Sequence, residues 1–65
     1  MTKLTRNAAR LINIANNLDR ATDKGIAVLN AASFDDLNLA FSVASARSWN
    51  RAAINLGVWL DRRAR

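Results

Sequence analysis

The stretch Ser33-Phe34-Asp35-Asp36 divides the chain into two halves. Ser33 can accept a hydrogen bond from a backbone N–H one turn further on, and Asp36 stands three residues later, where it can reach back to the start of a helix. Asp35 and Asp36 also place negative charge at the positive end of that helix. The pattern predicts that one helical segment ends before Ser33 and that another begins after it.

Helical patterns occupy both sides of this division. The sequence contains no proline, and strand-type alternation does not persist anywhere. Apolar residues recur in steps of four and three in both halves, as they do along a helix with one buried face. We therefore predict an all-α fold in a single small domain, residues 1–65, with helix 1 at about 3–31, an elbow at 32–33 and helix 2 at about 34–62.

Each of the two predicted helices contains one point at which it could break. Gly25 could cap an early end of helix 1, but the apolar register continues past it to Leu29, which favours one continuous helix. Ser48 could cap a third helix after a break near Arg47-Ser48. We favour an antiparallel helical hairpin of two long helices, and the alternative is a small three-helix bundle with that break.

The small size of the chain suggests that it is completed by self-association or by a partner. A chain of 65 residues buries only about 60% of the surface that its unfolded form exposes, so its own core is marginal. The sequence has no cysteine for a disulfide and no histidine for a zinc site. Additional burial against another molecule is the remaining way to gain stability.

A second apolar strip on helix 2 is the first candidate binding surface. It lies about half a turn away from the main apolar stripe, and a helix that is apolar on two sides normally sits inside a bundle. Arginines border this strip and could supply polar contacts at the rim of a protein interface. The predicted residues are Leu39, Val43, Ile54 and Val58 in the strip, and Arg47 and Arg51 at its rim. The alternative is that helix 2 is broken and that the strip is internal to a three-helix bundle.

A basic face is the second candidate surface. The formal net charge is +5, and eight of the ten basic residues are arginine, which binds carboxylates and phosphates through a planar fork. An Arg/Asn row on helix 1 follows steps of four and three, and it suits phosphate oxygens or an acidic protein surface. The residues predicted to face an anionic partner are Lys3, Arg6, Arg10, Asn13, Asn17 and Arg20, together with Arg62 and Arg63 near the end of the chain.

Asparagine is unusually common for a helical chain. Eight asparagines occur, several of them inside predicted helices, where asparagine is not a preferred residue. Amide contacts across a helix–helix interface would explain them, and so would a compositional bias. No pair of helices has helix-turn-helix proportions, so a base-specific use is not indicated.

The residue types argue against catalysis. The sequence has no His, Cys, Glu or Tyr, and capping explains the adjacent carboxylates of Asp35 and Asp36. No glycine-rich phosphate loop is present. We therefore predict that the protein is not an enzyme and uses neither a cofactor nor a metal. Nothing resembles a signal peptide or a membrane span, so we expect a soluble protein of the cytoplasm.

In size and composition the chain resembles the short, basic, cysteine-free accessory proteins of bacteriophages and mobile elements. That resemblance implies a protein that binds and alters a host or viral macromolecule inside the host cell. Our first hypothesis is an interaction protein that inhibits or modulates a protein target through its helix faces. The alternatives are a sequence-nonspecific nucleic-acid-binding protein that uses the Arg/Asn face, and a structural component of a larger particle.

Overall fold

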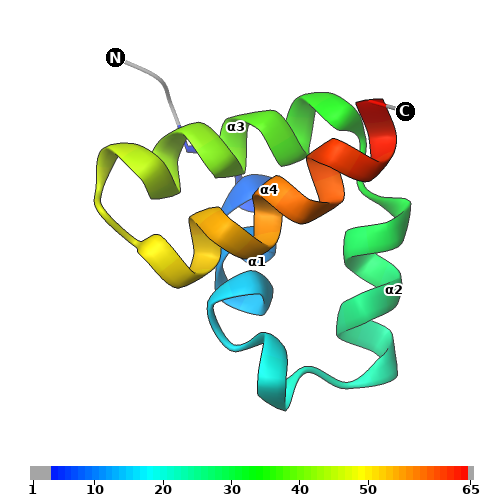
Figure 1. Ribbon diagram of the computed structural model, residues 1–65. Helices are drawn as coiled ribbons and strands as arrows, with labels where there is room; N and C mark the ends of the chain where they lie inside the picture. The colour runs from blue at the N-terminus through cyan, green and yellow to red at the C-terminus, as the bar shows by residue number, and fades with distance from the viewer. Residues whose placement is uncertain (1–3, 65) are drawn as a thin grey trace.

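Helices make up most of the protein (Figure 1). The computed structural model describes residues 4–64, and within this range there are four α-helices and no strand. The all-α prediction is therefore confirmed. The helices are α1 (Arg6–Asn16), α2 (Asp23–Ala31), α3 (Phe34–Ala46) and α4 (Asn50–Ala64), and a short 3-10 turn at Leu18–Arg20 follows α1.

The first half of the chain is broken, so the prediction of one helix over 3–31 is wrong. Helix α1 ends at Asn16, and α2 begins only after Thr22, whose hydroxyl accepts a hydrogen bond from the N–H of Gly25 at 3.4 Å. The apolar register does run through Thr22, but the residue starts a new helix instead of continuing the old one. Gly25 lies in the first turn of α2, so the alternative in which it caps helix 1 is also wrong.

The predicted start of a helix after Ser33 is confirmed. The Ser33 hydroxyl accepts a hydrogen bond from the N–H of Asp36 at 3.1 Å, and the backbone of Ser33 is extended, as an N-cap requires. Ala32 is likewise extended, and it separates α2 from α3. The elbow at 32–33 is therefore present, but it joins the short helix α2 to α3, whereas the prediction had it join two long helices.

A second break divides the predicted helix 2 at Arg47-Ser48, the position that the alternative architecture required. Helix α3 ends in a Schellman motif, in which the N–H of Trp49 donates to the carbonyl of Ala44 at 2.9 Å and that of Ser48 donates to Ser45 at 3.2 Å. Ser48 has a φ of 60°, in the left-handed region. It therefore terminates α3, and α4 begins two residues later at Asn50.

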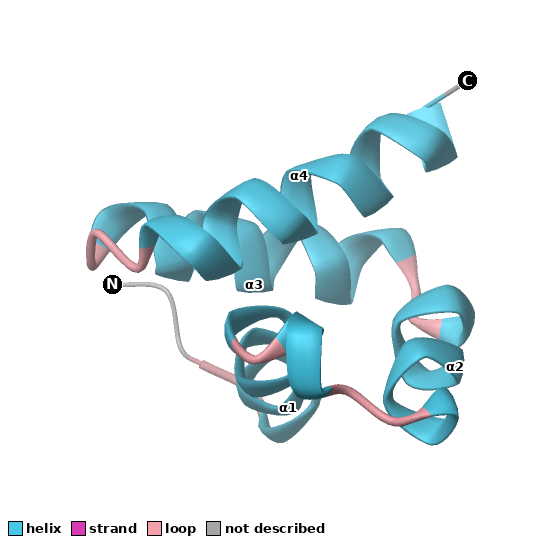
Figure 2. Cartoon of the chain, turned by 60° about the horizontal axis from the view of Figure 1, so that its bottom comes forward, coloured by secondary structure: helices cyan, strands magenta, loops and turns pink. Residues whose placement is uncertain are grey.

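Helices α3 and α4 run antiparallel on either side of this turn, and α1 packs against both of them (Figure 2). Helix α2 stands at the side of this group and packs against α1. Each helix contributes one large, fully buried side chain to the core, namely Leu11, Leu29, Leu37 and Leu56. Buried alanines between them, such as Ala15 and Ala52, allow the helices to approach closely.

Replacing Ser48 by glycine should stabilise the protein. The left-handed conformation costs a residue with a Cβ about 1–2 kcal/mol in conformational free energy, whereas glycine adopts this conformation without a steric clash. We expect Ser48→Gly to raise the free energy of unfolding by about 1 kcal/mol, measured by urea denaturation followed by circular dichroism.

Ser42→Gly is the matched control, because Ser42 is an exposed serine in the interior of α3. Glycine there should destabilise the protein by about 0.5 kcal/mol through its low helix propensity. Loss of stability in both variants would show that Ser48 does not adopt the left-handed conformation.

Candidate interaction surfaces

The predicted apolar strip is not one surface. Val43 is buried in the core at 8% exposure, and Leu39 is half-buried against the same core. Ile54 and Val58 are 68% and 43% exposed. The break after α3 explains this difference in exposure. Because α4 folds back on α3, the pair Leu39 and Val43 on α3 no longer lies on the same face as the pair Ile54 and Val58 on α4. The core therefore uses Val43, and Leu39 packs partly against that core, so these two residues do not form one exposed surface with Ile54 and Val58.

Ile54 and Val58 lie on the side of α4 that faces away from the core. Residues at the spacing 51, 54, 58 and 61 fall within an arc of about 80° on a helix with 3.6 residues per turn. All four of them are exposed. We call this set, Arg51, Ile54, Val58 and Asp61, the outer α4 face. In Figure 1, α4 crosses in front of α1 and α3.

The two predicted rim residues have different surroundings. Arg47 belongs to the turn between α3 and α4, and its guanidinium carbon lies 5.2 Å from the centroid of the Trp49 ring, within range of a cation–π contact. Arg51 is exposed in the first turn of α4, next to Ile54 on the outer α4 face. The structure therefore keeps Arg51 beside the exposed apolar pair and directs Arg47 toward an aromatic ring.

The inner side of α4 carries polar contacts to the other helices. The Asn55 side chain donates a hydrogen bond to the carbonyl of Ala15 at 2.7 Å. Ala15 is one of the last four residues of α1, whose carbonyls have no partner within their own helix. Asn17 supplies two further bonds there, from its side chain to Asn13 and from its backbone N–H to Ile14. Asn55 and Asn17 together therefore cap the end of α1.

The end of α2 is held in the same way. The indole N–H of Trp59 donates to the side-chain oxygen of Asn30 at 2.9 Å, and the Arg63 guanidinium donates to the backbone carbonyl of Asn30. Asn30 lies in the last turn of α2, so the Arg63 contact satisfies a carbonyl that its own helix leaves free. We call Asn55, Trp59 and Arg63 the inner polar row; its members are four residues apart and share one side of α4.

The predicted anionic-partner face is only partly assembled. Arg6, Arg10 and Asn13 are exposed along α1, and Asn17 follows directly after the end of that helix. Arg20 belongs to the 3-10 turn after α1, so it is no longer in register with this row. Lys3 lies outside the described residues.

The two arginines near the end of α4 have contacts within the chain. Arg63 binds Asn30, and the guanidinium carbon of Arg62 lies 5.4 Å from the centroid of the Trp59 ring. The Arg63 contact joins α4 to α2, whereas the Arg62 contact lies within α4 itself, and sequence periodicity indicated neither of them. They are exposed, but a partner would have to share or displace these contacts.

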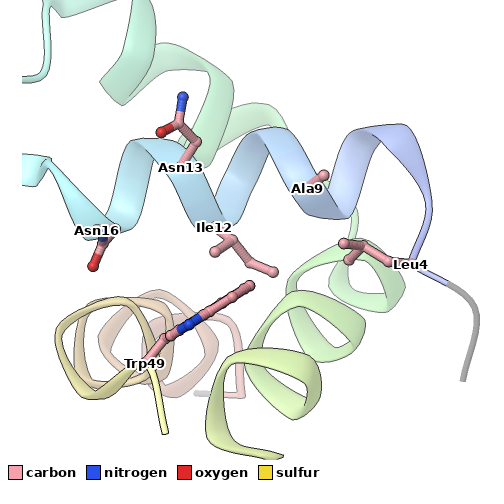
Figure 3. Close-up of a pocket in the computed structure, with 6 residues that line it drawn as sticks. All are labelled: Leu4, Ala9, Ile12, Asn13, Asn16 and Trp49. Atoms are coloured by element: carbon pink, nitrogen blue, oxygen red, sulfur yellow. The ribbon is translucent and has the colours of Figure 1, made fainter. Parts of the chain in front are cut away.

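A shallow cleft of about 280 Å³ lies between α1 and the turn that follows α3 (Figure 3). Ile12 and Trp49 face each other across it, and Trp49 is 39% exposed. Asparagine side chains at its edge are the main polar groups. The lining residues are Leu4, Ala9, Ile12, Asn13, Asn16 and Trp49. None of these described lining residues is charged, so this part of the cleft is apolar with two amides at its edge.

Buried polar side chains and groups of three or more metal-binding side chains are both absent from the described residues. Between residues 4 and 64, no polar or charged side chain is buried, and no group of three carboxylates gathers where a metal ion could bind. No helix in this range is long and apolar enough to cross a membrane.

Comparisons with known proteins give no relative. No protein-family model matches the chain, and neither the curated proteins nor the solved structures contain a match.

Replacing Asn55 by alanine tests the inner polar row. The substitution removes the donor to the Ala15 carbonyl and leaves that carbonyl without its partner at the helix end. We expect a loss of about 1 kcal/mol in the free energy of unfolding, measured by urea denaturation, even though alanine is the better helix former.

Asn38→Ala is the matched control. Asn38 is exposed in the interior of α3, so alanine gains the same helix propensity there without breaking a contact between helices. This variant should be as stable as the original protein or slightly more stable. Equal stability of Asn55→Ala and Asn38→Ala would contradict the assigned role of Asn55.

Proposed function

We propose that this chain is a non-enzymatic interaction protein that binds a protein target through the outer α4 face. The observation that carries the proposal is the exposure of two aliphatic side chains one turn apart, with Ile54 at 68% and Val58 at 43%. They lie on α4, the longest helix in the described part of the chain. An apolar centre with charged residues around it is the usual arrangement of a protein-binding site.

The free energy available from burying Ile54 and Val58 is enough for a modest docking site. Full burial of an isoleucine or valine side chain contributes about 1.5–3 kcal/mol. Ile54, at 68% exposure, retains most of that potential, and Val58, at 43%, retains less than half of it. Arg51 and Asp61 border the apolar pair on the same face of the helix. Arginine is among the residues most often found at the energetic centres of interfaces. The outer α4 face therefore combines apolar area with charges of both signs.

The mode of action that we propose is occlusion. A domain of 65 residues that lies across a functional surface of a larger protein blocks access to it. Inhibition or modulation of that target follows without any chemistry by the small protein. The resemblance in size and composition to accessory proteins of bacteriophages and mobile elements agrees with this role.

Ile54→Asp should abolish target capture. A carboxylate at the centre of the interface would have to be desolvated without a partner, which costs several kcal/mol. We expect at least a tenfold loss of the protein captured by the immobilised chain from a lysate of its own cell, quantified by mass spectrometry with and without nuclease.

Ser42→Asp serves as the control, because it adds the same charge at an exposed position of α3. It should leave capture unchanged. If Ile54→Asp and Ser42→Asp capture the same proteins in the same amounts, the outer α4 face is not the docking site. If capture disappears with nuclease, the partner is a nucleic acid.

A second candidate function is sequence-nonspecific binding of nucleic acid through α1. Arg6, Arg10 and Asn13 are exposed on this helix, with Asn17 at its end, and these side chains suit phosphate oxygens. A role as a structural component of a larger particle would use the same surfaces.

The salt dependence of affinity for a DNA duplex decides this candidate. Two phosphate contacts from arginine should give a slope of about −1.8 in a plot of log affinity against log salt concentration. Arg6→Ala/Arg10→Ala should remove that slope. Absence of binding at 20 mM salt would exclude the candidate.

A further inference from the structure

The outer α4 face is complementary to itself. Arg51 and Asp61 each lie five residues from Leu56, about 7.5 Å along the helix axis in opposite directions, at 1.5 Å per residue. Ile54 and Val58 each lie two residues from the same point, about 3 Å along the axis. A two-fold axis at the level of Leu56, perpendicular to the helix, would therefore place each of these residues opposite its complement.

We propose that the outer α4 face also binds a second copy of this chain, which pairs α4 with α4 in antiparallel orientation. This inference rests on the proposed function, in that it takes the same face as the docking surface. In the dimer, Ile54 packs on Val58 of the second copy, and Arg51 pairs with Asp61 of the second copy. The two-fold symmetry then makes each contact twice.

The spacing of the residues fits such packing. Arg51, Ile54, Val58 and Asp61 follow steps of three, four and three, which is the seam of two helices that cross at a shallow angle. All four are exposed in the single chain, so the seam is accessible. Asp61 also interacts within its own chain, but a carboxylate has about four acceptor sites and can receive Arg51 in addition.

Charge selects the antiparallel orientation. A parallel pair would place Arg51 opposite Arg51 and Asp61 opposite Asp61, with like charges at both ends of the apolar pair. The antiparallel pair replaces both repulsions with attractions. A target of another kind would need its own acidic and basic groups at these distances, whereas a second copy provides them by symmetry.

The area of this face predicts a weak dimer. One face of the 15-residue helix α4 is smaller than the roughly 800 Å² per partner of a standard stable interface. We expect a dissociation constant of about 0.1–1 mM. At this strength the dimer dissociates readily, and the outer α4 face remains available to another target.

Charge-reversal variants test the inference by sedimentation equilibrium and by NMR titration at concentrations up to 2 mM in 0.15 M salt. Arg51→Asp places two carboxylates opposite each other, and Asp61→Arg places two guanidinium groups opposite each other. Each variant alone should therefore dimerise at least tenfold more weakly than the original chain. An equimolar mixture of the two variants should form a heterodimer with about the original affinity, because every charged pair is complementary again.

The mixture carries its own control for nonspecific attraction. Each substitution changes the net charge of +5 by two units, so both variants remain positive and repel each other overall. Both altered residues are exposed, and unchanged thermal melting would confirm that the variants fold. Ile54→Asp should abolish dimerisation, and Ser42→Asp should not affect it.

Four results would overturn the inference: a monomeric original chain at 2 mM, dimerisation that survives Ile54→Asp, single charge variants that dimerise normally, or a mixture that fails to recover affinity. Recovery in the mixture supports it. Failure here is distinct from failure of the proposed function. If the chain stays monomeric but captures a target, and if this capture depends on Ile54, the proposed function stands and the dimer proposal fails.

Discussion

The inner polar row of α4 (Asn55, Trp59 and Arg63) joins parts of the chain that are far apart in sequence. The breaks in the first half leave two helix ends whose carbonyls lack partners, at Ala15 in α1 and at Asn30 in α2. The row donates to both. A small core gains little from a few leucines alone, so satisfied helix ends matter for its stability.

This row also determines which surface is exposed. Once the Asn55 and Trp59 side of α4 faces the other helices, helical geometry directs the 51, 54, 58 and 61 positions outward. Ile54 and Val58 then remain in solvent, although each would be suitable for a core. The same contacts that complete the fold thus create the outer α4 face on which the proposed function depends.

Sequence patterns predicted some of the local features. Ser33 begins a helix as expected, because its hydroxyl contacts an N–H only three residues away. They failed at Thr22, where the apolar period continued while the hydroxyl started a new helix. The Asn16-Asn17 pair before it is a typical helix end, and it was a signal for this break. The sequence did not indicate that Ser48 adopts a left-handed conformation, because the usual residue at such a position is glycine.

The surfaces were harder to predict because they depend on contacts between distant residues. Val43 and Ile54 belong to one strip only if residues 34–62 form a continuous helix, and the turn at Ser48 sends them in different directions. Asparagine content suggested amide contacts between helices, and Asn55 makes one. Its acceptor is Ala15, 40 residues earlier, a distance that no periodicity along the chain encodes.

Amide hydrogen exchange in the Asn30→Ala variant, measured by NMR, tests most directly whether the inner polar row holds α2 in place. Alanine favours the helix more than asparagine does, so helix propensity alone would slow exchange in α2. Loss of the Trp59 contact to the Asn30 side chain should instead speed exchange across α2 by about fivefold to tenfold, with α1 and α3 nearly unchanged. Unchanged or slower exchange in α2 would contradict this role of the row.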